Sequence, residues 1–235
     1  MKRILLVITA LLAVASTCLS AAERHEVKVG EFTQLNVTDN INVDYVCCPD
    51  SSGMAVFAAD AKVVSGILFE NNGKGKLTIQ VAPDVLAAGH LPTVTVYSSS
   101  LQEAKNQGDS TLRLVRLAKT PVLKCVITDN GRLVAHGIDA VTAQLNISTG
   151  RGKIVADGRC TNLRVKNVGK GEIQADQLPA QSVHCTIIGT GSIGCTVQGG
   201  ELKVTGSGTG KVYYKGKPSS VTVHKLGSIK AIPLQ

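Results

Sequence analysis

The sequence predicts an all-β fold, a parallel β-helix with coils of about 20 residues. A glycine placed two residues before Leu, Ile or Val recurs at spacings of 21, 19, 20, 19 and 17 residues, at Gly131, Gly152, Gly171, Gly191, Gly210 and Gly227. Between these glycines apolar and polar residues alternate, as in residues 145–148 (LNIS) and 163–166 (LRVK). Period-two alternation indicates strands with one buried face. A fixed period indicates that the strands stack as repeats.

Two columns of side chains are predicted to point into the interior. The first lies two residues after each glycine and holds Leu133, Ile154, Ile173, Ile193, Val212 and Ile229. The second lies four residues after it and holds Ala135, Ala156, Ala175, Cys195, Tyr214 and Ala231. The recurring glycines are expected at turns, because glycine adopts positive φ without strain.

Two glycine motifs imitate nucleotide-binding loops. Residues 187–195 (IIGTGSIGC) contain G-x-G-x-x-G, but the following residues are poor helix formers, so no helix N-terminus is offered to a pyrophosphate. Residues 205–212 (TGSGTGKV) resemble a P-loop, but Thr205 replaces its first glycine and Val212 its Ser or Thr. We therefore expect neither a nucleotide nor another cofactor.

Residues 23–100 are predicted to form a less regular β section of the same single domain, followed by regular coils over 101–235. Residues 32–46 place six apolar side chains in two alternating runs around a turn at 38–40, namely Phe32, Leu35, Val37, Ile41, Val43 and Tyr45. Asn72-Gly73 predicts a second turn. Residues 84–90 are the one stretch that suggests a short helix.

Residues 1–22 have the pattern of an export signal. Lys2 and Arg3 precede an apolar run from Ile4 to Ala15, and small residues suit cleavage before Glu23. The run is shorter than the ~20 residues that span a bilayer. A lipid anchor at Cys18 is the minor alternative, because Thr17 is a poor residue before a lipidated cysteine.

The charge and the cysteine content limit the possible classes of function. Without Lys2 and Arg3, 23 basic and 17 acidic residues remain, a net charge of +6 with no run of like charge, which argues against nucleic acid as a partner. Six cysteines remain after residue 22: Cys47, Cys48, Cys125, Cys160, Cys185 and Cys195. Buried thiols are favoured over a disulfide framework. Metal binding ranks lowest, because C-x-x-C and His-paired spacings are absent from the sequence.

The chain resembles the head GIN domain family of autotransporter adhesins, exported proteins common in Bacteroidetes. The resemblance rests on the entry pattern of Phe32–Tyr45, the strand GKGKLTIQV, the G-x-G-x-[I/V] repeats and the stretch Gly208–Pro218. It covers nearly all of the chain after residue 22 and implies a right-handed parallel β-helix. It carries no catalytic motif, and six cysteines exceed what the family leads us to expect.

Two outward sets of side chains are candidate sites. Asp157 and Asp176, five residues after their glycines, are expected one coil apart beside His136, where they would suit Ca²⁺ binding or acid/base catalysis. Asp is also a common turn residue, and that interpretation is favoured. The second set is a basic stripe that suits an acidic glycan or polymer, formed by Arg164, Lys166, His184, Lys203 and His224. Solvated lysines on a sheet surface are the alternative.

Three functions follow from these features. The favoured one is an exported, non-enzymatic adhesin or surface-binding protein that contacts a cell-surface or extracellular anionic polymer. A structural scaffold without a ligand is not separable from it by sequence. The alternative is a carbohydrate-active enzyme or glycan-binding protein, a polysaccharide lyase or hydrolase in the enzymatic case, that uses Asp157 and Asp176. The sequence leaves the oligomeric state open.

Overall fold

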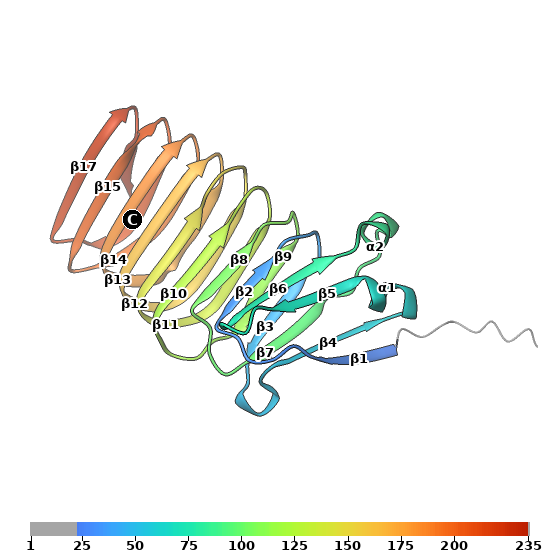
Figure 1. Cartoon of the computed structure of the whole chain (residues 1–235). Coiled ribbons are helices and arrows are strands. Elements are labelled where there is room, and N and C mark those ends of the chain that lie inside the picture. Colours follow the sequence, from blue (N-terminus) through green and yellow to red (C-terminus); the bar gives the residue numbers. More distant parts are fainter. Residues whose placement is uncertain (1–22, 235) are drawn as a thin grey trace, which may run out of the picture.

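The structure, a computed structural model, describes residues 23–234, and the predicted export signal and Cys18 lie outside them. A β-solenoid of about seven turns follows an N-terminal curled mixed sheet. Figure 1 shows the coils stacked side by side, from the curled sheet at one end to the C-terminus at the other. This architecture confirms the predicted β-helix with its less regular N-terminal section.

The N-terminal section combines parallel and antiparallel strands. Strand β4 pairs antiparallel with β1 and β7, and β5 pairs antiparallel with β6. Strand β2 lies between β6 and β8, and β3 lies between β7 and β9, all in parallel. The elements are β1 (Glu23–Lys28), β2 (Gln34–Val37), β3 (Val43–Cys47), a 3-10 turn (Pro49–Ser51), β4 (Met54–Ala59), α1 (Ala61–Gly66), β5 (Ile67–Asn71), β6 (Lys76–Val81), α2 (Pro83–Ala88) and β7 (Val94–Ser98).

The coils that follow pair only in parallel within the described residues. Their strands are β8 (Glu103–Asn106), β9 (Thr111–Arg116), β10 (Thr120–Ile127), β11 (Arg132–Ile147), β12 (Lys153–Gly169), β13 (Glu172–Gly189), β14 (Ser192–Gln198), β15 (Glu201–Gly208), β16 (Lys211–Lys217), β17 (Ser220–Gly227) and β18 (Lys230–Pro233). Long strands β11, β12 and β13 each contribute to two sheets. Sheet 1 contains β8, β10, the second halves of β11, β12 and β13, and then β15 and β17. Sheet 2 contains β9, the first halves of β11, β12 and β13, and then β14, β16 and β18.

The predicted interior columns are present through most of the solenoid. Leu133, Ile154, Ile173, Ile193 and Val212 lie opposite one another on successive coils, and all five are fully buried. Four members of the second column, Ala135, Ala156, Ala175 and Cys195, are also buried. Tyr214 follows Cys195 in register and is half-buried. The six apolar residues predicted for the N-terminal runs, Phe32 to Tyr45, are buried as well.

The last coil departs from the predicted register. Gly227 lies opposite Gly208, not Gly210, so Ala231 pairs with Val212 and Pro233 with Tyr214. Ile229 therefore occupies the column of the recurring glycines, where it is fully buried. On preceding coils this position lies over a large side chain: a Cβ on Gly210 would stand 2.4 Å from Cδ1 of Ile187. Ile187 is followed in its own column by Gly206, which has no side chain and leaves room for Ile229.

The recurring glycines are required for close packing and not for positive φ. Gly131, Gly152, Gly171, Gly191 and Gly210 do not have positive φ, whereas the glycines two positions before four of them, Gly150, Gly169, Gly189 and Gly208, do. Gly227, with φ 92°, belongs to this second column. A Cβ on Gly191 would stand 2.4 Å from the Gly171 carbonyl oxygen and 2.6 Å from Nδ2 of Asn167. The expectation about φ was thus wrong for five of the six glycines.

Replacement of Gly191 by Ala is expected to lower the free energy of unfolding by about 1–3 kcal/mol, the usual cost of overpacking a core. Gly194→Ala is the matched control three residues away, because its Cβ would meet nothing closer than 3.9 Å. Urea denaturation of both variants measures the difference. Equal stability of the two variants would contradict the packing explanation.

Buried polar groups occur inside the coils. Asn167 Nδ2 donates to the carbonyl oxygens of Gly171 (2.7 Å) and Ser192 (3.0 Å), and Asn106 makes the equivalent bonds to Ser110 and Arg132. These side-chain amides supply hydrogen bonds to turn carbonyl groups that the close packing shields from water. The six cysteines within residues 23–234 are free thiols. The preference for buried thiols holds for Cys125, Cys185 and Cys195, whereas Cys47, Cys48 and Cys160 are only half-buried. Burial raises the pKa of the Cys125 thiol to about 12.

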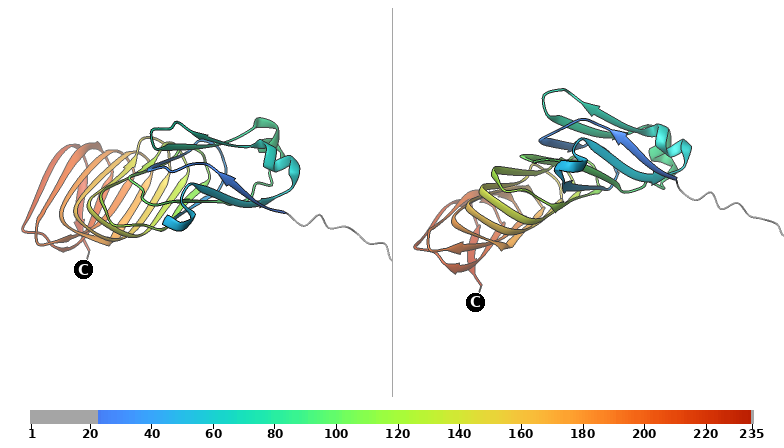
Figure 2. Two further views of the ribbon diagram at one scale, coloured as in Figure 1. Left: turned by 60° about the horizontal axis from the view of Figure 1, so that its bottom comes forward. Right: turned by 90° about the horizontal axis from the view of Figure 1, so that it is seen from below.

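Two short helices lie at the N-terminal end of the stack (Figure 2). Helix α2 confirms the predicted helix near residues 84–90, and the Asn72-Gly73 turn joins β5 to β6. Helix α1 was not predicted. The side chain of Asp60 accepts a hydrogen bond from the Val63 amide at its N-terminus, the usual capping arrangement. Neither helix in residues 23–234 has the length and apolar character needed to cross a membrane.

Candidate ligand-binding face

The predicted basic stripe lies on the outer surface of sheet 1, where it forms two columns rather than one. Arg164, His184 and Lys203 are successive neighbours in the first column, in which Glu103, Lys124 and Gln144 precede them. Lys166 and His224 belong to the adjacent column, separated by Thr186 and Thr205. Neighbouring strands lie about 4.8 Å apart. Residues from several coils therefore face solvent as one surface, which we call the basic face: Lys105, Lys124, Arg164, Lys166, His184, Lys203 and His224.

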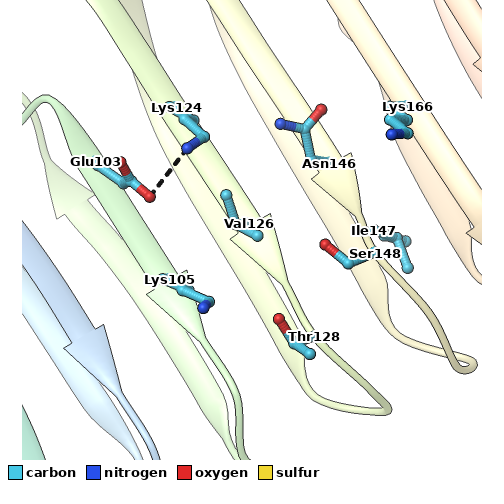
Figure 3. Close-up of a pocket in the computed structure, with 9 residues that line it drawn as sticks. All are labelled: Glu103, Lys105, Lys124, Val126, Thr128, Asn146, Ile147, Ser148 and Lys166. Carbon is cyan, nitrogen blue, oxygen red and sulfur yellow. Dashed lines mark hydrogen bonds and ion pairs between the residues drawn. The ribbon is translucent and has the colours of Figure 1, made fainter.

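The basic face contains a hollow of about 320 Å³ over β8, β10, β11 and β12. Figure 3 shows Lys105, Lys124 and Lys166 at its border, around the smaller side chains of Val126 and Asn146. Ser148 and Thr128 add hydroxyl groups to the lining. Lys124 Nζ forms an ion pair of 3.1 Å with Glu103. The hollow arises because short residues in the centre lie between long basic residues on neighbouring coils.

A second hollow, of about 210 Å³, lies farther along the same face. It is lined by Arg164, His184, Lys203 and Glu201, with Asn162 and Ser182 beside them. Burial lowers the pKa of His184 below its ordinary value, and the charges of Lys203 and Arg164 lower it further. His184 is therefore neutral at neutral pH. At neutral pH its ring nitrogens can form hydrogen bonds to a ligand in the second hollow. The ring adds a positive charge to the hollow only at acid pH.

Lys105 and Lys124 were missed by the sequence reasoning, although a signal for Lys124 was present. The alternation in residues 122–127 (VLKCVI) points Lys124 outward in phase with Arg164. Lys105 was harder to assign, because its coil lacks the recurring glycine and its place beside Val126 appears only in the register of β8 with β10.

Sheet 2 also has basic residues, but they are arranged differently. Arg113 forms a bidentate ion pair with Asp44, with both distances 2.6 Å, and Lys153 pairs with Glu172 at 3.1 Å. The two hollows described above do not include residues of sheet 2. A hollow of about 260 Å³ on β9 of sheet 2 has one cation in its lining, Arg113, which is the residue paired with Asp44. Sheet 1 is the face on which several basic side chains line hollows.

The carboxylate pair proposed from the sequence is not assembled as expected. The register slips between β12 and β13, so that Asp157 lies opposite Gln177 and not Asp176. Asp157 Oδ2 lies 2.6 Å from Nδ1 of His136, which confirms that these two residues are neighbours. The other oxygen of Asp157 accepts a hydrogen bond of 2.6 Å from the Gly137 amide.

Asp176 has a different partner. Lys215 Nζ, two coils away, donates to Asp176 Oδ2 at 3.0 Å, and this bond lowers the pKa of the carboxyl group below its ordinary value. Each carboxylate is thus held in its own local contact, as expected for charged residues at a corner. Within residues 23–234 we found no group of three His, Cys, Asp or Glu side chains arranged to hold a metal ion.

A parallel β-solenoid with an outer face of this kind places the chain among repeat proteins that present extended surfaces. Residues 31–218 match the family model described as "Putative auto-transporter adhesin, head GIN domain", and the chain belongs to this family. Membership implies export. A search of curated proteins found no significant match.

Solved structures share the fold at low sequence identity. A crystal structure described as a "putative adhesin" from Bacteroides fragilis has a TM-score of 0.75 at 17% identity, covering 90% of this chain and 96% of that one. One so described from Parabacteroides merdae has a TM-score of 0.70 at 18% identity, with 91% and 96% covered. A "putative lipid binding protein" from Parabacteroides distasonis has a TM-score of 0.63 at 17% identity, with the same coverage.

Proposed function

We propose that this protein is a non-enzymatic adhesin, exported to the cell surface or its surroundings, that binds an anionic polymer along the basic face. The observation that carries the proposal is the set of Lys105, Lys124, Lys166, Arg164 and Lys203 around two hollows on the same face. Four of these cations, all except Lys124, have no ion-pair partner among the pairs in the described residues.

The spacing of the cations favours a polymer over a small ligand. One hollow extends over β8, β10, β11 and β12 and the other over β12, β13 and β15, and they share no lining residue, so a compact molecule in either one would contact only part of the cations. A chain with repeated carboxylate or sulfate groups would contact several coils at once. Weak contacts at several linked sites add to a useful affinity. The hydroxyl and amide groups between the cations supply hydrogen bonds to sugar hydroxyls, so an acidic glycan is the polymer class that fits best.

The separate contacts of the two candidate carboxylates support the non-enzymatic part of the proposal. A general acid needs a raised pKa, whereas the pKa of Asp176 is lowered by Lys215. Asp157 is fixed by His136 and a backbone amide. The carbohydrate-active alternative would require these two residues to act together, and their separate partners oppose this.

A glycan array that contains carboxylated, sulfated and neutral polysaccharides tests the proposal. We expect binding to the acidic members and not to the neutral ones. Equal signals on acidic and neutral glycans would overturn the electrostatic mechanism. No signal on any glycan would favour the scaffold interpretation. Cleavage of an arrayed glycan that is lost in Asp157→Ala would establish the enzymatic alternative.

A further inference from the structure

The C-terminal end of the solenoid is an open sheet edge. Strand β17 pairs with β15 and β18 pairs with β16, and within residues 23–234 none of the paired registers covers the other edge of β17 or β18. Alternate residues of the eight-residue strand β17 therefore direct backbone N–H and C=O groups to solvent along one side. Such an edge is a template for another strand. Figure 2 shows the contrast with the N-terminal end, which strands β1, β4 and β5 and the two helices occupy.

The open edge is apolar on the side that continues the core. Val221 and Val223 lie opposite Leu202 and Val204, which are fully buried on the preceding coil. The valines are 42% and 37% exposed. They therefore occupy interior positions that one more strand would cover. An alternation of apolar and polar side chains is what such a strand would need.

The charge around this edge indicates which kind of strand could bind there. From residue 202 to residue 235 the sequence has no Asp or Glu and six lysines, namely Lys203, Lys211, Lys215, Lys217, Lys225 and Lys230. Lys217, Lys225 and Lys230 are exposed on the last strands. Two copies that met edge to edge would bring these lysines together, and like charges across neighbouring strands are destabilising. An acidic strand would instead meet opposite charges.

We propose that the C-terminal edge of the solenoid binds an extended acidic peptide segment, which adds as a strand beside β17. Its alternating apolar side chains would cover Val221 and Val223. Its carboxylates would lie on the outer side, beside Thr222 and His224, where the positive charge of the surrounding lysines attracts them. Backbone hydrogen bonds supply affinity in strand addition, and side chains supply selection. The site borders the end of the basic face, because His224 lies on β17 and Lys203 lies on the neighbouring strand β15. It uses the backbone edge of β17, so a peptide probe tests it separately from the glycan proposal.

The probe is a fluorescein-labelled octapeptide of alternating Glu and Val, with binding to the purified protein followed by fluorescence anisotropy. The wild-type protein should bind it, and should bind an alternating Lys and Val peptide at least tenfold more weakly. A Glu and Val peptide with N-methyl groups at alternate residues retains charge and side chains but loses N–H donors. We expect at least tenfold weaker binding of that peptide. Undiminished binding of the N-methylated peptide would overturn strand addition.

Protein variants locate the peptide. The triple variant Lys217→Glu, Lys225→Glu and Lys230→Glu should lose binding at least tenfold. The triple variant Lys105→Glu, Lys124→Glu and Lys166→Glu changes the basic face on β8, β10 and β12, which do not pair with β17, and should retain most of it. Loss of binding only in the second variant would overturn the proposal. So would a wild-type dimer in analytical ultracentrifugation that Val223→Lys dissociates, because the occupant would then be a second copy.

Discussion

Ile173→Ala should lower the free energy of unfolding by about 2–5 kcal/mol, the range for truncation of a large aliphatic residue in a packed core. Ile173 is fully buried and lies between Ile154 and Ile193 in the interior column. Removal of its side chain leaves a cavity that borders two coils. Each coil of a solenoid is stabilised by contacts with its neighbours, so both interfaces weaken together.

Val223→Ala is the control for this substitution. Val223 occupies an interior position on the last coil but is 37% exposed, and its truncation should cost less than about 1 kcal/mol, as for partly exposed sites. Urea denaturation of both variants measures the two costs. Similar costs for Ile173→Ala and Val223→Ala would show that the interior column does not hold the coils together.

The triple variant Arg164→Glu, Lys166→Glu and Lys203→Glu should lose most of the affinity for an acidic glycan. A Lys or Arg beside an anionic surface contributes about 1 kcal/mol. Loss of three such contacts therefore lowers affinity by roughly 100-fold at low salt. Wild-type affinity should fall as salt rises, because the contacts are solvent-exposed and screened. The variant should depend less on salt than the wild type, because Lys105 and Lys124 are the lysines of the first hollow that it keeps.

A matched variant separates a local site from total charge. Arg132→Glu, Lys153→Glu and Lys211→Glu changes the net charge equally but lies on sheet 2, in a single column. It should retain binding within a few-fold of wild type. Equal losses in the two variants would mean that overall charge, and not the basic face, attracts the polymer.

Acid pH should strengthen binding in the wild type. Burial and neighbouring cations hold the pKa of His184 below its ordinary value, so the ring gains a proton only as pH falls below neutrality. The added positive charge lies within the second hollow and attracts a polymer that keeps its charge in acid. A sulfated glycan isolates this effect, and His184→Gln should remove it.

The repeated part of the chain was predictable because two short-range signals agree. Alternation identifies the inward residues, and the recurring glycine places them on successive coils, as for Ile154 and Ile173. The last coil was misplaced for a physical reason. Gly227 belongs to the column of positive-φ glycines, opposite Gly208. The next position in the column of recurring glycines is therefore taken by Ile229, for which Gly206 leaves room, and this is seen only in the strand register.

The candidate site was predictable only in part, because it depends on register between coils. The outward direction of Arg164 and Lys166 follows from alternation, but their separation into two columns follows from strand pairing. A one-residue slip between β12 and β13 places Asp157 opposite Gln177 instead of Asp176, and sequence spacing does not reveal such a slip. Helix α1 was missed because it is a single short segment whose only signal is the cap at Asp60.

Lysine footprinting is the most direct test of the basic face. The protein is acetylated briefly with and without the acidic polysaccharide that gives the strongest array signal, and each lysine is quantified by mass spectrometry. We predict that Lys124, Lys166 and Lys203 are protected by the polymer, whereas Lys153 and Lys211 on sheet 2 react equally in both samples. Protection of the sheet 2 lysines, with sheet 1 unchanged, would contradict the proposed binding face.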